Sequence, residues 1–299
     1  MTDDDGAPEW FRRAIEAPAE ESALTVEGCR IAFRRWGEPD KPAVVLVHGG
    51  GAHSRWWDHI GPLLATEYCA VALDLSGHGD SGRRPAYSFD TWAQEILAVA
   101  GAGAGSEPPV VVGHSMGGKA TMQAAALAGS RLRGIIIVDS PVEAATSPEE
   151  EQAGRRSAFG PLRLYPTVEA ALERFHTVPD QPGSLPYVID HVARVSLRPA
   201  DGGWTWKFDP NFTVRGGQVE PATLSRITCR VALLRAEHGL VTPDIGSFMY
   251  EQLGRTAPVV EIPAANHHVM LDQPLSLVTA VRTLLADWRH SSAVRRRPG

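Results

Sequence analysis

The sequence has few cysteines and no long apolar run. Its three cysteines, Cys29, Cys69 and Cys229, lie far apart without metal-ligand spacing, so we expect neither a disulfide framework nor a metal site. No run reaches the roughly eighteen apolar residues of a membrane-spanning helix. The acidic start, Met1–Asp5, lacks the apolar segment of a signal peptide. We therefore expect a cytoplasmic protein without a membrane span.

An excess of positive charge is also missing. The chain has 29 Lys and Arg against 35 Asp and Glu, a formal net charge of −6, so nucleic acid is not an expected partner. Its hydrophobic content of 43% and charged content of 21% are typical of a globular protein. A chain of 299 residues can form one large domain or a core with an insertion.

Against these absences stands one informative stretch, Val110–Gly118. An apolar, β-branched run ends in Gly-His-Ser-Met-Gly, and small, helix-compatible residues follow at 119–126. The pattern predicts a buried strand, a very tight turn with Ser115 at its apex, and a helix. The flanking glycines, Gly113 and Gly117, remove the Cβ atoms that would clash in such a turn.

A serine on this kind of turn lies at a helix N-terminus, where backbone N–H groups favour developing negative charge. A serine hydroxyl is a poor nucleophile at neutral pH, so it needs a base to accept its proton. The base in turn needs an acid partner that fixes its tautomer. Ser115 is therefore a candidate nucleophile whose partners have to be sought elsewhere in the chain.

Further apolar runs alternate with helical patterns along the chain. A hairpin is predicted around Glu27-Gly28, followed by buried strands and two clear helices at 89–99 and 274–290. This alternation predicts a mostly parallel sheet covered on both faces. The predicted strands after the hairpin are 43–47, 69–74, 110–114, 134–139, 229–235 and 259–262.

Four motifs together resemble the α/β-hydrolase superfamily over roughly residues 22–290. They are the Ser115 turn, the glycine loop His48–Gly51, the D-x-x-G-x-G-x-S segment Asp74–Ser81, and the histidine loop ending in His267. The resemblance implies an eight-stranded, mostly parallel sheet flanked by helices, with a helical cap inserted after the sixth strand. The implied organisation is an N-terminal arm (1–21), a core (22–141 and 223–290), a helical cap (142–222) and a disordered tail (291–299).

The resemblance also assigns site residues. The backbone N–H groups of Gly50 and Met116 would form an oxyanion hole, and His267 would be the base. Asn266 stands where the family usually has glycine, which leaves His268 as a fallback for the base. His78 lies in a loop that is structural in the family, so we expect it to be a packed, hydrogen-bonded histidine.

The acid departs from the usual pattern. Most family members carry Asp after the seventh strand, but Gly239 falls at that place here. Asp139, at the end of the sixth strand, is the preferred candidate, with a carboxylate bonded to loop amides as its competing interpretation. Glu237 on the usual loop is the alternative acid, whereas Asp244 belongs to the first turn of a helix.

These residues predict a serine hydrolase that cleaves a carboxylic ester, lactone or thioester of a small to medium substrate through an acyl-enzyme. The reaction requires no cofactor and no metal. Two alternatives stay open: a hydrolase of carbon–carbon bonds with the same fold, and a catalytically silent protein that binds a small ligand. The natural substrate and the oligomeric state do not follow from the sequence.

Overall fold

The computed structural model describes residues 6–103, 107–142, 162–212 and 219–291. Its main sheet has eight strands in the order β1-β2-β4-β3-β5-β6-β9-β10. The first two strands form an antiparallel hairpin, β2 pairs antiparallel with β4, and the remaining pairs are parallel. The expected eight-stranded, mostly parallel sheet is confirmed. Its strands are β1 (Glu20–Val26), β2 (Cys29–Trp36), β3 (Ala43–Val47), β4 (Cys69–Leu73), β5 (Val110–His114), β6 (Gly134–Val138), β9 (Arg230–His238) and β10 (Val259–Asn266).

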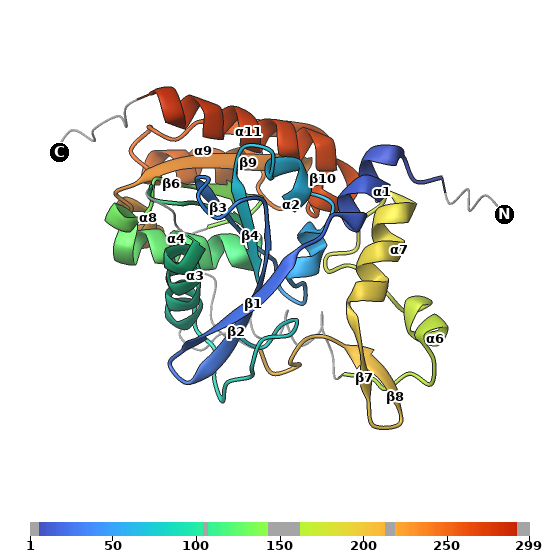
Figure 1. Cartoon of the computed structure of the whole chain (residues 1–299). Coiled ribbons are helices and arrows are strands. Elements are labelled where there is room, and N and C mark those ends of the chain that lie inside the picture. The colour runs from blue at the N-terminus through green and yellow to red at the C-terminus, as the bar shows by residue number, and fades with distance from the viewer. Residues whose placement is uncertain (1–5, 104–106, 143–161, 213–218, 292–299) are drawn as a thin grey trace.

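Helices cover both faces of this sheet (Figure 1). Every residue of β3, β4, β5 and β6 is buried, which explains why these strands are apolar on both faces. One face packs against α3 (Phe89–Gly103), α4 (Met116–Ala128), α8 (Pro221–Ser225) and α9 (Pro243–Gln252). The other packs against α1 (Glu9–Glu16), the 3-10 helix η1 (Ser54–Trp57), α2 (Gly61–Leu64), α10 (Val269–Asp272) and α11 (Pro274–His290).

The parallel strands β3, β5, β6, β9 and β10 all end at the same edge of the sheet. Ligand sites of open parallel sheets lie at this carboxyl edge. The edge gathers four segments that are distant in sequence: the glycine loop after β3, Ser115 after β5, Asp139 after β6 and His267 after β10.

Residues 162–212, within the segment between β6 and β9, project from the sheet (yellow in Figure 1). They contain α6 (Val168–Leu172), α7 (Pro186–Val195) and a two-stranded antiparallel sheet of β7 (Leu197–Ala200) and β8 (Gly203–Trp206). The segment expected to be a helical cap thus contains helices and, in addition, a small hairpin that the sequence did not predict. Gly202 has φ +83° and supports a tight turn, after which buried Thr205 alternates with less buried Trp204 and Trp206. That period of two is the signal for a hairpin.

The predicted N-terminal arm contains the helix α1. Phe11 on this helix is 2% exposed, and its ring centroid lies 4.8 Å from that of Tyr187 on α7. Trp10 contacts the same tyrosine edge to face. The arm thus packs on the core through these two aromatic residues, and β1 begins at Glu20, inside the range expected for the arm.

Three elements extend well past the ends that the sequence predicts. Helix α3 continues to Gly103 rather than 99, β9 continues to His238 rather than 235, and β10 continues to Asn266 past a register irregularity after Ile262. Of the tail expected to be disordered, 291–299, all but the first residue lies outside the described residues. Among the helices that the structure describes, none combines the length and apolar character that crossing a bilayer requires.

Candidate active site

Ser115 lies at a strained turn between β5 and α4. Its backbone has φ +53° and ψ −123°, a conformation rarely seen outside glycine. The turn is tight because α4 packs directly against the preceding strands. A Cβ on Gly117 would lie 2.2 Å from the His48 carbonyl oxygen, and one on Gly113 would lie 2.4 Å from Thr121 Oγ1. Both flanking glycines are thus required by close approach.

His267 follows β10 and reaches Ser115 across the carboxyl edge. The distance from Ser115 Oγ to His267 Nε2 is 3.0 Å, and that from His267 Nδ1 to Asp139 Oδ2 is 2.7 Å. The backbone of this loop is fixed as well, since His114 Nε2 donates to the carbonyl oxygen of His267 at 2.9 Å. The structure therefore brings Ser115, His267 and Asp139 into one hydrogen-bonded chain.

Asp139 occupies the end of β6 with φ +43° and is fully buried. Its carboxylate also accepts hydrogen bonds from the backbone N–H groups of Ala236, Leu240 and Val241, at 3.3, 2.8 and 3.2 Å. These donors come from the end of β9 and the loop that follows. The same carboxylate thus binds both the loop amides and the histidine, so the two interpretations of Asp139 do not exclude each other.

Gly239 explains why no acid follows the seventh strand. A Cβ at this position would lie 2.4 Å from both carboxylate oxygens of Asp139. Position 239 thus has no room for a side chain, because the Asp139 carboxylate occupies the space. Gly239, which stands where the family usually has its acid, and the Asp139 carboxylate that fills the space beside it are two parts of one packing arrangement.

The other candidate residues lie apart from this chain. Glu237 is exposed, and its Oε2 accepts a hydrogen bond from the Ala264 N–H at 2.7 Å. Asp244 lies in the first turn of α9, which Thr242 caps. The ring of His268 lies 4.7 Å from that of His267, but the histidine that is hydrogen-bonded to Ser115 is His267.

The glycine loop after β3 is held by His48. The Nε2 of this histidine accepts the Leu75 N–H at 3.1 Å, so Nδ1 carries the proton and donates to the Gly49 carbonyl oxygen at 2.7 Å. Burial lowers the pKa of His48 to about 4, which keeps the ring neutral and preserves both bonds. The loop bearing Gly50 is therefore anchored to the loop after β4.

His78 packs in the same loop region. It is 1% exposed, and its ring lies 4.6 Å from Phe212 and 5.0 Å from His48. Its Nδ1 lies 3.3 Å from the Ser76 carbonyl oxygen. These contacts agree with the packed, hydrogen-bonded histidine that the sequence predicts.

A cavity of about 560 Å³ adjoins the site. It meets the site at Gly50, Gly51 and His268 rather than at Ser115 itself. Aromatic and charged side chains alternate around it, most of them from the segment between β6 and β9. The aromatic lining residues are Trp56, Tyr165, Phe175, Trp206 and Phe208, and the charged ones are Arg163, Glu173, Arg174 and Lys207.

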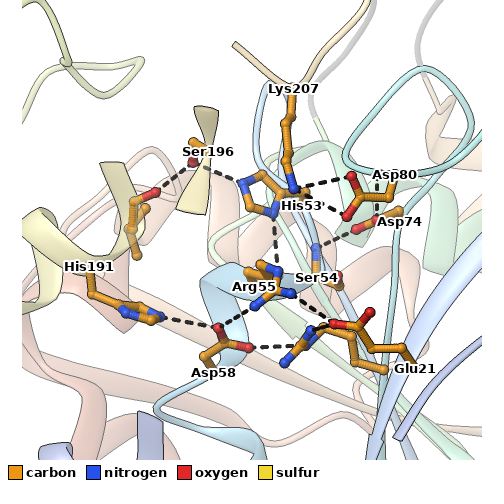
Figure 2. Close-up of polar contacts among 12 residues, drawn as sticks. Glu21, His53, Ser54, Arg55, Asp58, Asp74, Asp80, His191, Ser196 and Lys207 are labelled. Carbon is orange, nitrogen blue, oxygen red and sulfur yellow. Dashed lines mark hydrogen bonds and ion pairs between the residues drawn. The ribbon is translucent and has the colours of Figure 1, made fainter. Parts of the chain in front are cut away.

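A second serine–histidine contact lies nearby, between Ser196 and His53 (Figure 2). Here His53 Nδ1 accepts the Arg55 N–H at 3.3 Å, so Nε2 carries the proton and donates to Ser196 Oγ at 2.8 Å. Ser196 donates its own proton to the Val192 carbonyl oxygen at 2.6 Å. The proton direction is opposite to that of an activated serine, so this pair joins η1 to α7 structurally.

Further polar contacts lie around this pair, and one of them, between Asp58 and His191, joins the end of η1 to α7 as well (Figure 2). Asp58 pairs with Arg34 at 3.2 Å and with His191 of α7 at 3.1 Å, and Lys207 pairs with Asp80 at 3.1 Å. Sequence reasoning missed this cluster, as well as His114 beside His267. A signal was present in the number of histidines between 48 and 59, three in twelve residues, because buried histidines need defined partners.

Comparisons with known proteins agree with this geometry. The family model described as "Alpha/beta hydrolase family" matches residues 44–281. The chain is 27% identical over 274 residues to the esterase Rv0045c of Mycobacterium tuberculosis, covering 87% of this chain and 88% of that protein. It is 26% identical over 243 residues to the pimeloyl-[acyl-carrier protein] methyl ester esterase of Chromobacterium violaceum, covering 80% and 92%.

A solved structure, that of E-2-(acetamidomethylene)succinate hydrolase, superposes with a TM-score of 0.79. The match covers 90% of this chain and 100% of that one at 21% sequence identity. At this identity the likeness concerns the fold alone. It covers nearly the whole chain.

Proposed function

This chain belongs to the alpha/beta hydrolase family, and from that premise we propose that it is a serine hydrolase that cleaves a carboxylic ester through an acyl-enzyme. The observation that carries the proposal is the hydrogen-bonded chain from Ser115 Oγ through His267 to Asp139, with distances of 3.0 and 2.7 Å. The esterases among its relatives support the same class of bond.

The geometry supports a defined sequence of proton transfers. Ser115 Oγ attacks the acyl carbon while its proton passes to His267 Nε2, and the Nδ1–H of His267 stays bonded to Asp139. The imidazolium then protonates the departing alcohol. A water molecule, deprotonated by His267, attacks the acyl-enzyme and releases the acid and free Ser115.

The oxyanion would be bound by the backbone N–H groups of Gly50 and Met116. Met116 is the first residue of α4, so its N–H points out of the helix N-terminus. Loss of one such donor typically costs about 3–4 kcal/mol of transition-state stabilisation. We assign the segment between β6 and β9 as a cap that holds the substrate over this site, since it supplies most of the cavity lining.

The test combines turnover with covalent labelling. We expect the wild-type protein to release p-nitrophenol from short acyl esters, and a fluorophosphonate to lose fluoride and form a phosphonyl ester on Ser115, identified by peptide mass. Ser115→Ala is expected to abolish labelling and to lower kcat by at least about four orders of magnitude.

Ser196→Ala is the matched control, since Ser196 forms the other buried contact with a histidine. This variant is expected to keep the adduct on Ser115. Labelling at Ser196 instead, or turnover that survives Ser115→Ala, would overturn the proposal. Binding of small esters with neither adduct nor turnover would favour the catalytically silent alternative.

A further inference from the structure

Residues 178–185 of the proposed cap lie along the end of β10 and the loop that carries the proposed base. The Leu185 N–H donates to the Leu271 carbonyl oxygen at 2.8 Å. From the other side, Asn266 Nδ2 donates to the Pro182 carbonyl oxygen at 3.2 Å. The cap and the loop of the base are therefore joined by direct hydrogen bonds.

Gln181 binds the peptide group that directly follows the proposed base. Its side-chain Oε1 accepts the His268 N–H at 2.7 Å. Its Nε2 lies 3.4 Å from both the His268 carbonyl oxygen and Asp272 Oδ2. The orientation of the Gln181 amide is determined, because only its oxygen can accept an N–H.

The backbone on both sides of the base is held in the same way. The carbonyl oxygen of His267 accepts from His114 Nε2 at 2.9 Å, and the N–H of the same peptide group is the one bound by Gln181. Before the base, the Asn266 N–H donates to Oδ2 of the buried Asp272 at 2.7 Å. Of the three side chains that hold this backbone, Gln181 is the one that comes from the cap.

We propose that Gln181 is a positioning residue, which holds the His267 imidazole in line with Ser115 from the cap. The inference rests on the proposed function, in which His267 is the base. His268 is 4% exposed, so loss of the Gln181 oxygen would leave a buried N–H without an acceptor, and the peptide group would shift toward another partner. A displacement of about 1 Å in a reacting group can cost about 100-fold in rate.

The test replaces Gln181 by methionine, which has a similar length and no amide. We expect Gln181→Met to lower kcat for a p-nitrophenyl ester at least about tenfold, because the base is displaced. The KM is expected to change by no more than about twofold, since Gln181 does not line the cavity.

A second measurement needs no turnover. The Nδ1–H of His267 is bonded to the Asp139 carboxylate at 2.7 Å, and a short bond of this kind moves the proton NMR resonance to low field. We expect this resonance to shift or broaden in Gln181→Met, because the ring moves relative to Asp139.

Gln181→Glu gives an independent variant. A neutral glutamic acid can accept the His268 N–H and donate to Asp272 as the amide does, whereas its carboxylate is repelled by Asp272. We therefore expect the kcat of Gln181→Glu, relative to wild type at the same pH, to fall as pH rises. A ratio that does not depend on pH would contradict the contact with Asp272.

Gln273→Met is the matched control. Gln273 is also a half-buried glutamine beside this loop, but its amide donates to the Ala264 carbonyl oxygen at 3.5 Å. Its loss is expected to leave both kcat and the His267 resonance unchanged. Equal losses of kcat in the two methionine variants would overturn the positioning role, as would a Gln181→Met protein that loses thermal stability but keeps its kcat.

The two proposals fail separately. A protein that hydrolyses esters with the same kcat in wild type and Gln181→Met overturns only the positioning role. A protein without turnover, in which Gln181→Met still alters the His267 resonance, overturns the proposed hydrolysis and leaves the effect of Gln181 on His267 intact.

Discussion

The strand ends that carry Ser115, His267 and Asp139 differ from the cavity wall above them in how polar groups are bonded. At the strand ends, Asp139 accepts three backbone N–H groups and a histidine. In the wall, Arg163, Glu173 and Arg174 are exposed side chains. The Asp139 carboxylate is thus fixed by backbone N–H groups at the end of β9 and in the loop that follows, whereas these charged side chains of the cavity wall extend into solvent.

Among the residues at the strand ends, substitution of Asp139 is expected to have the largest effect on kcat. We expect Asp139→Asn to lower kcat about 10⁴-fold, because the amide cannot hold His267 in the required tautomer. Glu237→Gln is expected to change kcat by no more than about twofold, since Glu237 is exposed and bonds only a backbone amide. Steady-state hydrolysis of a p-nitrophenyl ester measures both, and an equal loss in the two variants would contradict the assignment.

The close contact between Gly239 and Asp139 allows a second test of the same assignment. Gly239→Asp alone is expected to lower activity, because the new Cβ would lie 2.4 Å from the Asp139 carboxylate. Adding Gly239→Asp to Asp139→Gly relieves that contact and places a carboxylate on the loop that usually carries it. We expect the double variant to exceed Asp139→Gly at least about tenfold in kcat.

A smaller effect is expected on the cavity side, at Trp206. Its ring lies 5.5 Å from Phe175 and 5.9 Å from Tyr165, and all three line the cavity. Trp206→Ala is expected to lower kcat/KM for the preferred acyl chain by about tenfold and to shift the preferred chain length, with a smaller change in kcat. Specificity profiles over acyl length measure this.

Trp10→Ala provides the matched control, since Trp10 packs on Tyr187 outside the cavity. Its acyl-length profile is expected to match that of the wild type. If Trp206→Ala lowers kcat as strongly as Asp139→Asn does, the proposed difference in role between the strand ends and the cavity wall is wrong.

The smallest expected effect is on how the free energy of unfolding depends on pH, and it involves His59. This histidine is buried, and its Nε2 donates to the Met270 carbonyl oxygen. Burial lowers its pKa to about 4, whereas a histidine in the unfolded chain has a pKa near 6.5. Between these values the unfolded state binds a proton that the folded state does not. The stability that His59 contributes is therefore complete above pH 6.5 and is lost as pH falls toward about 4.

His59→Gln removes this proton uptake. We expect the loss of unfolding free energy from pH 7 to pH 5 to be about 2 kcal/mol smaller in this variant than in the wild type. Urea unfolding at the two pH values measures it, independently of any constant change in stability. His176→Gln, at an exposed histidine, is expected to leave the wild-type difference unchanged, and parallel behaviour of both variants would refute the account.

Much of the fold follows from local patterns. The apolar runs and the glycines around Ser115 are short-range signals, so the parallel sheet and the strand-to-helix turn could be predicted. The β7–β8 hairpin was missed because its period of two spans only four residues per strand beside a glycine turn.

The contacts that complete the site are long-range. Asp139 and His267 lie 128 residues apart, and His53 and Ser196 lie 143 apart, so no window of sequence contains either pair. Choosing between Asp139 and Glu237 required knowledge of which carboxylate fills the space beside Gly239.

The close approach of Asp139 and Gly239 also couples these two positions. A side chain at position 239 has to displace either the Asp139 carboxylate or the loop after β9, and a shorter residue at position 139 removes that obstacle. Substitutions at the two positions are therefore expected to be non-additive, so the identity of one residue determines which residues the other position tolerates.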